Sequence, residues 1–106
     1  MEPDLVPEKP WFVYLLSCRG GRIYTGVTPD LVARMRKHRA GTGAKFTRGH
    51  PPDTLLAAKR FVSRGAALSM EHRMKKLPAL EKRALALVWS EEEGAEDLSL
   101  VVAALA

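Results

Sequence analysis

The stretch WFVYLLSCRGGRIYTGVT, residues 11–28, decides the fold of this chain. Its first part, from Trp11 to Cys18, is almost entirely apolar, β-branched or aromatic, which is typical of a strand buried on both faces. The second part, RIYTGV, has the same character and follows directly after two glycines. The stretch therefore predicts a β-hairpin with strands at about 11–17 and 22–27.

The hairpin carries two tyrosines, Tyr14 and Tyr24, and the length of its loop decides whether they share a face. A two-residue Gly20-Gly21 turn would place the tyrosines on opposite faces of the sheet. A three-residue connection, Arg19-Gly20-Gly21 with Gly21 in the left-handed conformation, would place them on the same face. If the two tyrosines work together, we expect an odd-length loop or a bulge.

The rest of the chain predicts one α/β domain of the α+β type, in the order β-β-α-β-α-α, with a small three-stranded antiparallel or mixed sheet flanked by helices. Thr28 is expected to cap the first helix, with Pro29 in its first position and Gly41 at its end. The remaining expected elements are a loop at 41–52, a strand at 54–62, a helix at 64–77 capped by Ser63, and a third helix from Pro78.

The two ends of the chain differ in composition from the middle. Residues 1–10 contain acids and three prolines, which predicts a disordered lead-in and no secretory signal. Residues 11–89 form the expected domain, and residues 90–106 are an acidic and then apolar tail that could pack on the body or on a partner. No apolar run approaches the ~20 residues of a membrane span, and the single cysteine favours a reducing, cytoplasmic location.

The formal net charge of +5 conceals an uneven distribution along the chain. Residues 11–90 contain sixteen Lys and Arg against four acids, a net charge of +12, while both ends are acidic. A basic folded body attracts phosphate polyanions. The distribution therefore favours a nucleic-acid partner over a merely solvated basic surface. Lys45, Arg48 and His50, in the expected loop, and Lys59 and Arg60, near the third strand, are the candidates for contacts with a nucleic-acid backbone.

Two helices carry polar residues that depart from the apolar pattern. In the first, Arg34 and His38 are four residues apart and share one side, with His38 near the edge of the apolar stripe and expected to be partly buried. An ordinary boundary histidine beside a solvated arginine is the alternative. In the second, Glu71 falls inside the apolar stripe. Such a carboxylate must pair with a cation, for example Arg34, be protonated, or bind a metal ion, and these possibilities stay open.

Together these residues resemble the GIY-YIG nuclease domain, with FVY ending at Tyr14 in the place of the first tripeptide and YTG beginning at Tyr24 in the place of the second. The likeness covers residues 11–89. Within the family, the chain looks most like the small stand-alone bacterial members of the UPF0213 type. Two departures stand out. Phe12 and Val13 replace the glycine and isoleucine of the first tripeptide, and the chain contains no asparagine, which many family nucleases use near the site.

The resemblance implies a metal-dependent endonuclease that hydrolyses phosphodiester bonds, with DNA favoured over RNA, in DNA repair or recombination. Glu71 would hold one Mg²⁺ or Mn²⁺ ion, and Arg34 would stabilise the phosphate charge. His38 and Tyr14 would orient and deprotonate the attacking water, with Tyr24 in support. No sequence-reading module is visible, so cleavage would be structure-selective or weakly specific, with a partner protein as a source of specificity.

Two other functions stay open at this point. One is a non-catalytic nucleic-acid-binding module that keeps the GIY-YIG fold. The other is an interaction protein that acts through its tail. A pure binder has no need of the carboxylate of Glu71 in an apolar stripe, so this residue favours the enzyme.

Overall fold

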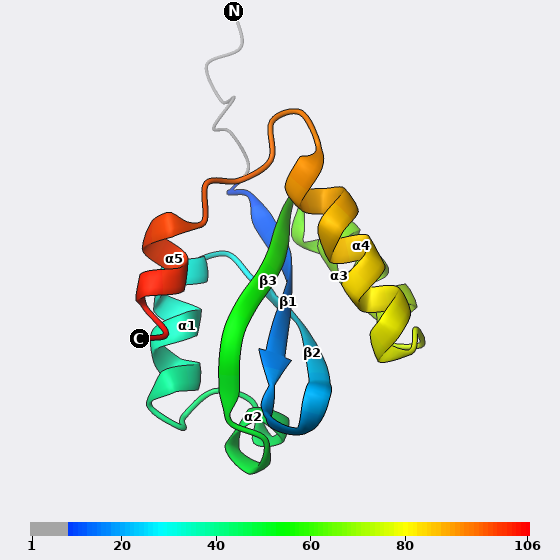
Figure 1. Ribbon diagram of the computed structural model, residues 1–106. Coiled ribbons are helices and arrows are strands. Elements are labelled where there is room, and N and C mark those ends of the chain that lie inside the picture. The colour runs from blue at the N-terminus through cyan, green and yellow to red at the C-terminus, as the bar shows by residue number, and fades with distance from the viewer. Residues whose placement is uncertain (1–8) are drawn as a thin grey trace, which may run out of the picture.

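The predicted hairpin forms the centre of the molecule. In the computed structural model, which describes residues 9–106, β1 (Trp11–Cys18) and β2 (Arg22–Thr28) pair antiparallel. β3 (Pro52–Phe61) pairs antiparallel with the other edge of β1, which gives a three-stranded sheet in the order β2-β1-β3 (Figure 1). β1 is buried on both faces because helices cover both sides of the sheet. The expected lead-in lies outside the described residues, apart from Lys9 and Pro10.

The hairpin loop has the odd length that a shared face requires. Arg19–Gly21 form a single 3₁₀ turn in which Gly20 and Gly21 have positive φ values of 81° and 73°. Tyr24 therefore pairs with Leu16, two residues along β1 from Tyr14. Because alternate residues of a strand share a face, both tyrosines point to the same side of the sheet.

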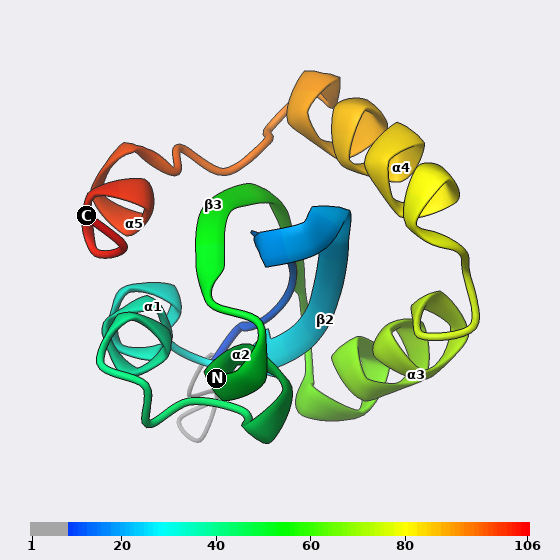
Figure 2. The same ribbon diagram turned by 60° about the horizontal axis from the view of Figure 1, so that its bottom comes forward.

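Three helices lie on that side: α1 (Leu31–Arg39), α2 (Lys45–Gly49) and α5 (Ser99–Ala103) (Figure 2). Apolar side chains of α1 and α5 meet those of β1 and β3 in a first core. Its buried members are Phe12, Tyr14, Leu16, Cys18, Leu31, Met35, Leu55, Ala58 and Val101.

The other side of the sheet is covered by α3 (Arg64–Met74) and α4 (Ala79–Glu91). A second core forms there from Val13, Leu15, Ile23, Ala57, Ala67, Met74, Ala86 and Trp89. α3 also contacts β2, and His38 of α1 packs against Tyr24 of β2 from the other side, so this edge strand lies between α1 on one face and α3 on the other. This arrangement brings the elements that carry the five predicted catalytic residues to the β2 side of the sheet.

Several element boundaries differ from the sequence-based expectation. Asp30, and not Thr28, caps α1, because its Oδ1 accepts a hydrogen bond from the Ala33 N–H at 3.0 Å. Residues 41–52 are not all loop, since they contain α2, and α3 ends at Met74, before the expected residue 77. The cap at Ser63 is confirmed by its hydrogen bond with the Ala66 N–H.

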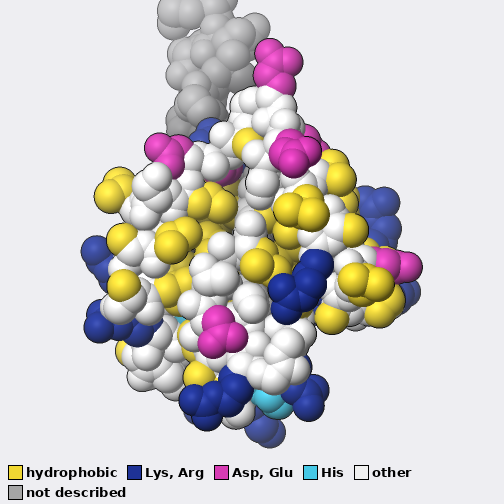
Figure 3. Space-filling model, in the orientation of Figure 1, with side chains coloured by type: hydrophobic (Ala, Val, Ile, Leu, Met, Phe, Trp, Pro, Cys, Tyr) yellow, Lys and Arg dark blue, Asp and Glu magenta, His cyan; other side chains and the backbone are white. Residues whose placement is uncertain are grey.

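The C-terminal segment packs on the body. Val101 of α5 is buried in the first core, and the salt bridges Lys59–Glu92 and Arg60–Glu96, both 2.9 Å long, join β3 to the acidic segment before α5. Lys and Arg side chains gather at the end of the molecule that carries α2 and the hairpin loop, and several acidic side chains lie at the opposite end (Figure 3). Within residues 9–106, none of the helices has the length and apolar character of a membrane span.

Candidate active site

A chain of hydrogen bonds links β1, α1 and α2. The hydroxyl of Tyr14 lies 2.7 Å from His38 Nε2, and His38 Nδ1 lies 2.9 Å from the hydroxyl oxygen of Thr47. The Thr47 hydroxyl donates to the backbone carbonyl of Ala44, so its oxygen accepts from Nδ1–H. The neutral imidazole then has its lone pair on Nε2, where it accepts the proton of the Tyr14 hydroxyl.

Arg34 and Tyr24 complete the cluster. The Nε–H of Arg34 donates to the Tyr14 hydroxyl oxygen over 3.3 Å. The Tyr24 ring packs against Tyr14 and His38, with ring centroids 6.1 and 5.5 Å apart. The structure thus brings together four of the five predicted catalytic residues on one face of the sheet.

Two glycines give the cluster the space it needs. Gly26 pairs with Tyr14 across the sheet, and a Cβ at residue 26 would overlap the phenol ring, with Cε1 only 2.8 Å away. Gly43 approaches the His38 ring in the same way. Sequence reasoning missed these glycines and Thr47 as parts of the site. The YTG triplet held a signal for Gly26, because glycine in a strand often marks a close approach.

Burial sets the protonation states of the cluster. Burial raises the pKa of Tyr14, and this effect outweighs the lowering by the hydrogen bond and charge of Arg34, while Tyr24 and Glu71 add smaller upward contributions. Tyr14 is therefore a neutral phenol near pH 7. Burial, with a smaller contribution from Arg34, lowers the pKa of His38 to about 4. The expectation of a partly buried histidine was wrong, since His38 is 2% exposed. Thr47 makes this burial possible because it satisfies Nδ1.

The buried neutral histidine makes the stability of the fold depend on pH. The pKa of His38 falls from its ordinary 6.5 to about 4 on folding, so the unfolded chain binds a proton more readily and stability declines as pH falls from 6.5 towards 4. Between about pH 7 and pH 4.5 the wild type should lose roughly 2–3 kcal/mol more unfolding free energy than His38→Gln. Urea denaturation at both pH values checks this, and equal losses in the two proteins would contradict it.

Glu71 lies on α3, on the other side of the β2 edge. Its side chain is 16% exposed, and its Oε2 lies 3.5 Å from Nζ of Lys75 on the next turn. The cation beside Glu71 is therefore Lys75 and not Arg34, which the sequence had suggested. The carboxylate is near enough to raise the pKa of Tyr14.

The oxygens of Glu71 suit a hard divalent cation. Its pairing with Lys75 is longer than a good hydrogen bond, so lone pairs stay available. Within residues 9–106 no group of three or more His, Cys, Asp or Glu side chains gathers to form a full ligand set. Mg²⁺ is often held by one or two carboxylates together with water and substrate phosphate, so a single glutamate fits such an ion.

The candidate nucleic-acid contacts fall into two groups. Lys45 and Arg48 are exposed on α2, and the His50 ring stacks on Phe46 at 4.5 Å, which itself stacks on Tyr24. These three candidates lie beside the cluster. The other two, Lys59 and Arg60, lie on β3 at the opposite edge of the sheet, where Glu92 and Glu96 pair with them.

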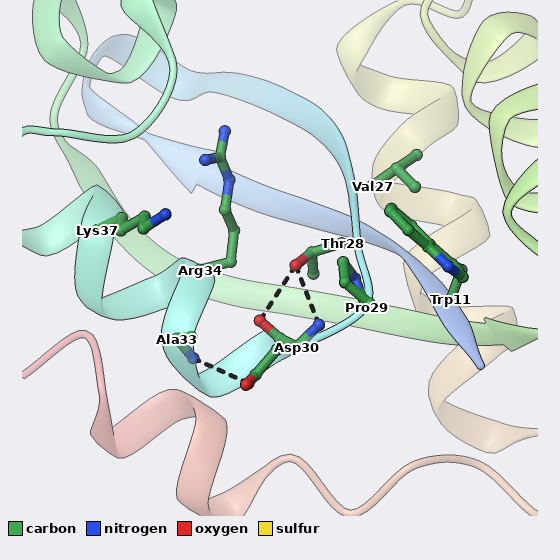
Figure 4. A pocket seen from close by; sticks show the side chains of 8 residues that line it. All are labelled: Trp11, Val27, Thr28, Pro29, Asp30, Ala33, Arg34 and Lys37. Atoms are coloured by element: carbon green, nitrogen blue, oxygen red, sulfur yellow. Dashed lines mark hydrogen bonds between the residues drawn. The ribbon is translucent and has the colours of Figure 1, made fainter. Parts of the chain in front are cut away.

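A pocket of about 340 Å³ opens where β2 meets α1 (Figure 4). Arg34 and Lys37 extend from α1 on one side of the pocket, and Trp11 and Val27 lie on the strands on the other side. Because Arg34 also donates to Tyr14, the pocket adjoins the cluster. Its lining residues are Trp11, Val27, Thr28, Pro29, Asp30, Ala33, Arg34 and Lys37.

Comparisons with known proteins agree with the resemblance. Residues 10–84 match the family model described as the GIY-YIG catalytic domain. A UPF0213 protein of Xanthomonas axonopodis pv. citri is 45% identical over 72% of this chain and 74% of its own length, and one of Cupriavidus pinatubonensis is 43% identical over 71% and 83%. The solution NMR structure of a UPF0213 protein of Bacillus halodurans is 39% identical, covers 74% of this chain and 84% of its own, and has a TM-score of 0.48.

Proposed function

The chain belongs to the GIY-YIG family and, within it, to the UPF0213 proteins, and from this membership and the geometry of the site we propose that it is a divalent-metal-dependent endonuclease that hydrolyses DNA. The observation that carries the proposal is the buried hydrogen-bonded series Arg34–Tyr14–His38–Thr47. Such a series can orient a proton acceptor beside a cation that binds phosphate. A merely structural cluster would not require a tyrosine, a histidine and an arginine to meet at the edge of a basic protein.

The direction of the hydrogen bonds supports a separate role for each member of the series. Tyr14 is protonated at rest, so it can act as a base only while it gives up its own proton. As the attacking water transfers a proton to the Tyr14 oxygen, the Tyr14 proton passes to Nε2 of His38 over the 2.7 Å bond. The water oxygen then forms the new bond to phosphorus, and the bond to the leaving oxygen breaks. The leaving oxygen takes a proton from solvent. His38 is left as imidazolium, and because it is buried its proton returns to solvent through the Tyr14 hydroxyl.

Binding of a phosphate would make His38 a better base. Burial is the main cause of its lowered pKa, and the charge of Arg34 is the second. A phosphate bound to the guanidinium offsets that charge, so the pKa of His38 rises when the substrate is in place. Thr47 is a positioning residue in this scheme, because it keeps the proton on Nδ1 and the lone pair on Nε2.

Glu71 would hold one divalent ion, Mg²⁺ or Mn²⁺, which when bound neutralises charge on the phosphate and the leaving oxygen. Lys75 helps to keep the carboxylate in place from the next turn of α3. The side chain comes from the opposite face of the sheet to Tyr14, so the reacting phosphate would lie at the β2 edge, between α1 and α3.

The surface supports binding of a nucleic-acid substrate through its backbone, without recognition of its base sequence. Lys45, Arg48 and His50 lie beside the cluster and would contact the backbone of the bound strand. We propose DNA as the substrate in preference to RNA. The enzyme would act in DNA repair or recombination in the cytoplasm, and a partner protein would supply its specificity.

Replacing Arg34 with alanine should lower the cleavage rate by ~10²-fold or more, because one preorganised donor to the phosphate is removed. Binding of DNA in EDTA should also weaken. Arg34→Lys should recover only part of the rate, since an ammonium lacks the planar fork of the guanidinium. Arg36→Ala, an exposed cation on the same helix, is the matched control and should keep nearly full activity. An unchanged cleavage rate in Arg34→Ala would show that Arg34 takes no part in the reaction.

A further inference from the structure

We propose that the pocket between Trp11 and Lys37 is a nucleotide subsite, which holds one unpaired nucleotide of the substrate strand with its base against Trp11 and its phosphate at Lys37 and Arg34. The inference rests on the proposed function, because it takes a nucleic-acid strand as the ligand. It adds a preference for an unpaired base next to the cleaved bond.

The size and place of the pocket suit a single nucleotide. Its volume of about 340 Å³ lies at the lower end of the ~300–1,000 Å³ range of ligand pockets. It adjoins the cluster through Arg34, whose Nε reaches the Tyr14 hydroxyl. A strand with its cleaved phosphate at Arg34 therefore has a neighbouring nucleotide within reach of the pocket.

Charge places the phosphate on the α1 side of the pocket. Arg34 and Lys37 lie three residues apart and extend along the same side of the helix (Figure 4). Lys37 is exposed and has no salt-bridge partner among residues 9–106. The carboxylate of Asp30 also lines the pocket, with Oδ1 bound to the Ala33 N–H. It disfavours a phosphate at that end but can accept hydrogen bonds from the polar N–H groups of a base.

Trp11 supplies an apolar aromatic surface on the other side. It is partly exposed although it packs on the second core, and the guanidinium of Arg64 lies 5.5 Å from its ring centroid. Stacking of bases on aromatic side chains is independent of sequence, and nearby arginine strengthens it. A base within a duplex is already stacked on its neighbours and would have to leave the helix to reach Trp11, so the subsite favours single-stranded ends, flaps and branches.

Binding in EDTA tests the subsite separately from cleavage. The probes are a short labelled oligothymidylate, the same oligonucleotide with one abasic position, and a blunt duplex. Lys37→Ala and Trp11→Ala should each raise the dissociation constant for the single strand about tenfold. Arg39→Ala, which removes the same charge from an exposed position of α1, should change it less than about twofold. Trp11→Phe should bind more tightly than Trp11→Ala.

A second measurement uses the unaltered protein. The oligothymidylate should shift the NMR indole resonance of Trp11, assigned by its loss in Trp11→Phe, and the duplex should shift it less. The subsite would be overturned if Lys37→Ala and Trp11→Ala weakened binding of the single strand no more than Arg39→Ala does. It would also be overturned if the Trp11 indole resonance did not move when the oligothymidylate bound, or if the single strand did not bind at all. If the protein binds in this manner but never cuts, the subsite proposal stands and the proposed nuclease activity is wrong. If the protein cuts normally with both substitutions, the nuclease activity stands and the subsite proposal is wrong.

Discussion

Glu71→Gln is expected to lose metal-dependent DNA cleavage by ~10³-fold or more, while binding DNA in EDTA as well as the wild type. The amide has the shape of the carboxylate but lacks the charge that holds a divalent ion, and loss of the several kcal/mol that such an ion contributes corresponds to this factor. The fold should persist, because the side chain is partly exposed and its only salt bridge within residues 9–106 is the long one to Lys75. Initial cleavage rates across a Mg²⁺ or Mn²⁺ titration measure the effect.

The matched control is Glu81→Gln, which removes the same charge from an exposed position in the first turn of α4. It should cleave at the wild-type rate. Undiminished cleavage by Glu71→Gln, with a thermal midpoint like that of the wild type, would show that the glutamate does not serve the reaction.

Gly26→Ala is expected to reduce cleavage by ~10²–10³-fold and to destabilise the fold by about 1–3 kcal/mol. The new methyl group would overlap the Tyr14 ring, which lies directly over residue 26, so the ring must move and its hydrogen bond to His38 must break. Activity should fall further than the loss of stability alone explains. Cleavage rates measured well below the thermal midpoint separate the two effects.

Gly65→Ala serves as the control for this substitution. Gly65 lies in the first turn of α3, and a Cβ there would meet nothing within 4 Å. Alanine should leave activity unchanged and stabilise the helix by about 0.5–1 kcal/mol. If Gly26→Ala behaves like Gly65→Ala, Tyr14 does not need its observed position for catalysis.

The parts of the fold that the sequence predicts are those with a local signal. The two-sided strand at Trp11–Cys18, the hairpin and the cap at Ser63 follow from neighbouring residues, and all three are confirmed. The short helix α2 was missed because the glycines and prolines around it are typical of a loop, and five helical residues give little periodic pattern.

The parts that were missed depend on contacts between distant segments. A helical wheel places His38 near the edge of the apolar stripe, but its complete burial depends on Thr47, which arrives from another element. The pairing of Lys59 with Glu92 joins residues 33 positions apart and cannot be read from the basic composition of the strand. Four of the predicted residues, Tyr14, Tyr24, Arg34 and His38, do meet, because the hairpin register and the helix spacing position them locally. Their catalytic roles stay a prediction.

The most direct test of the central proposal is cleavage of labelled single-stranded, duplex, flap and four-way-junction DNA by the wild-type protein, each with Mg²⁺, Mn²⁺ or EDTA, beside Glu71→Gln purified in parallel. The proposed site predicts cutting that requires the metal, is lost in the variant, and is strongest where an unpaired nucleotide lies next to the cleaved bond. Tight binding of the same DNAs with no cutting in either metal, or cutting that persists equally in EDTA and in Glu71→Gln, would contradict it.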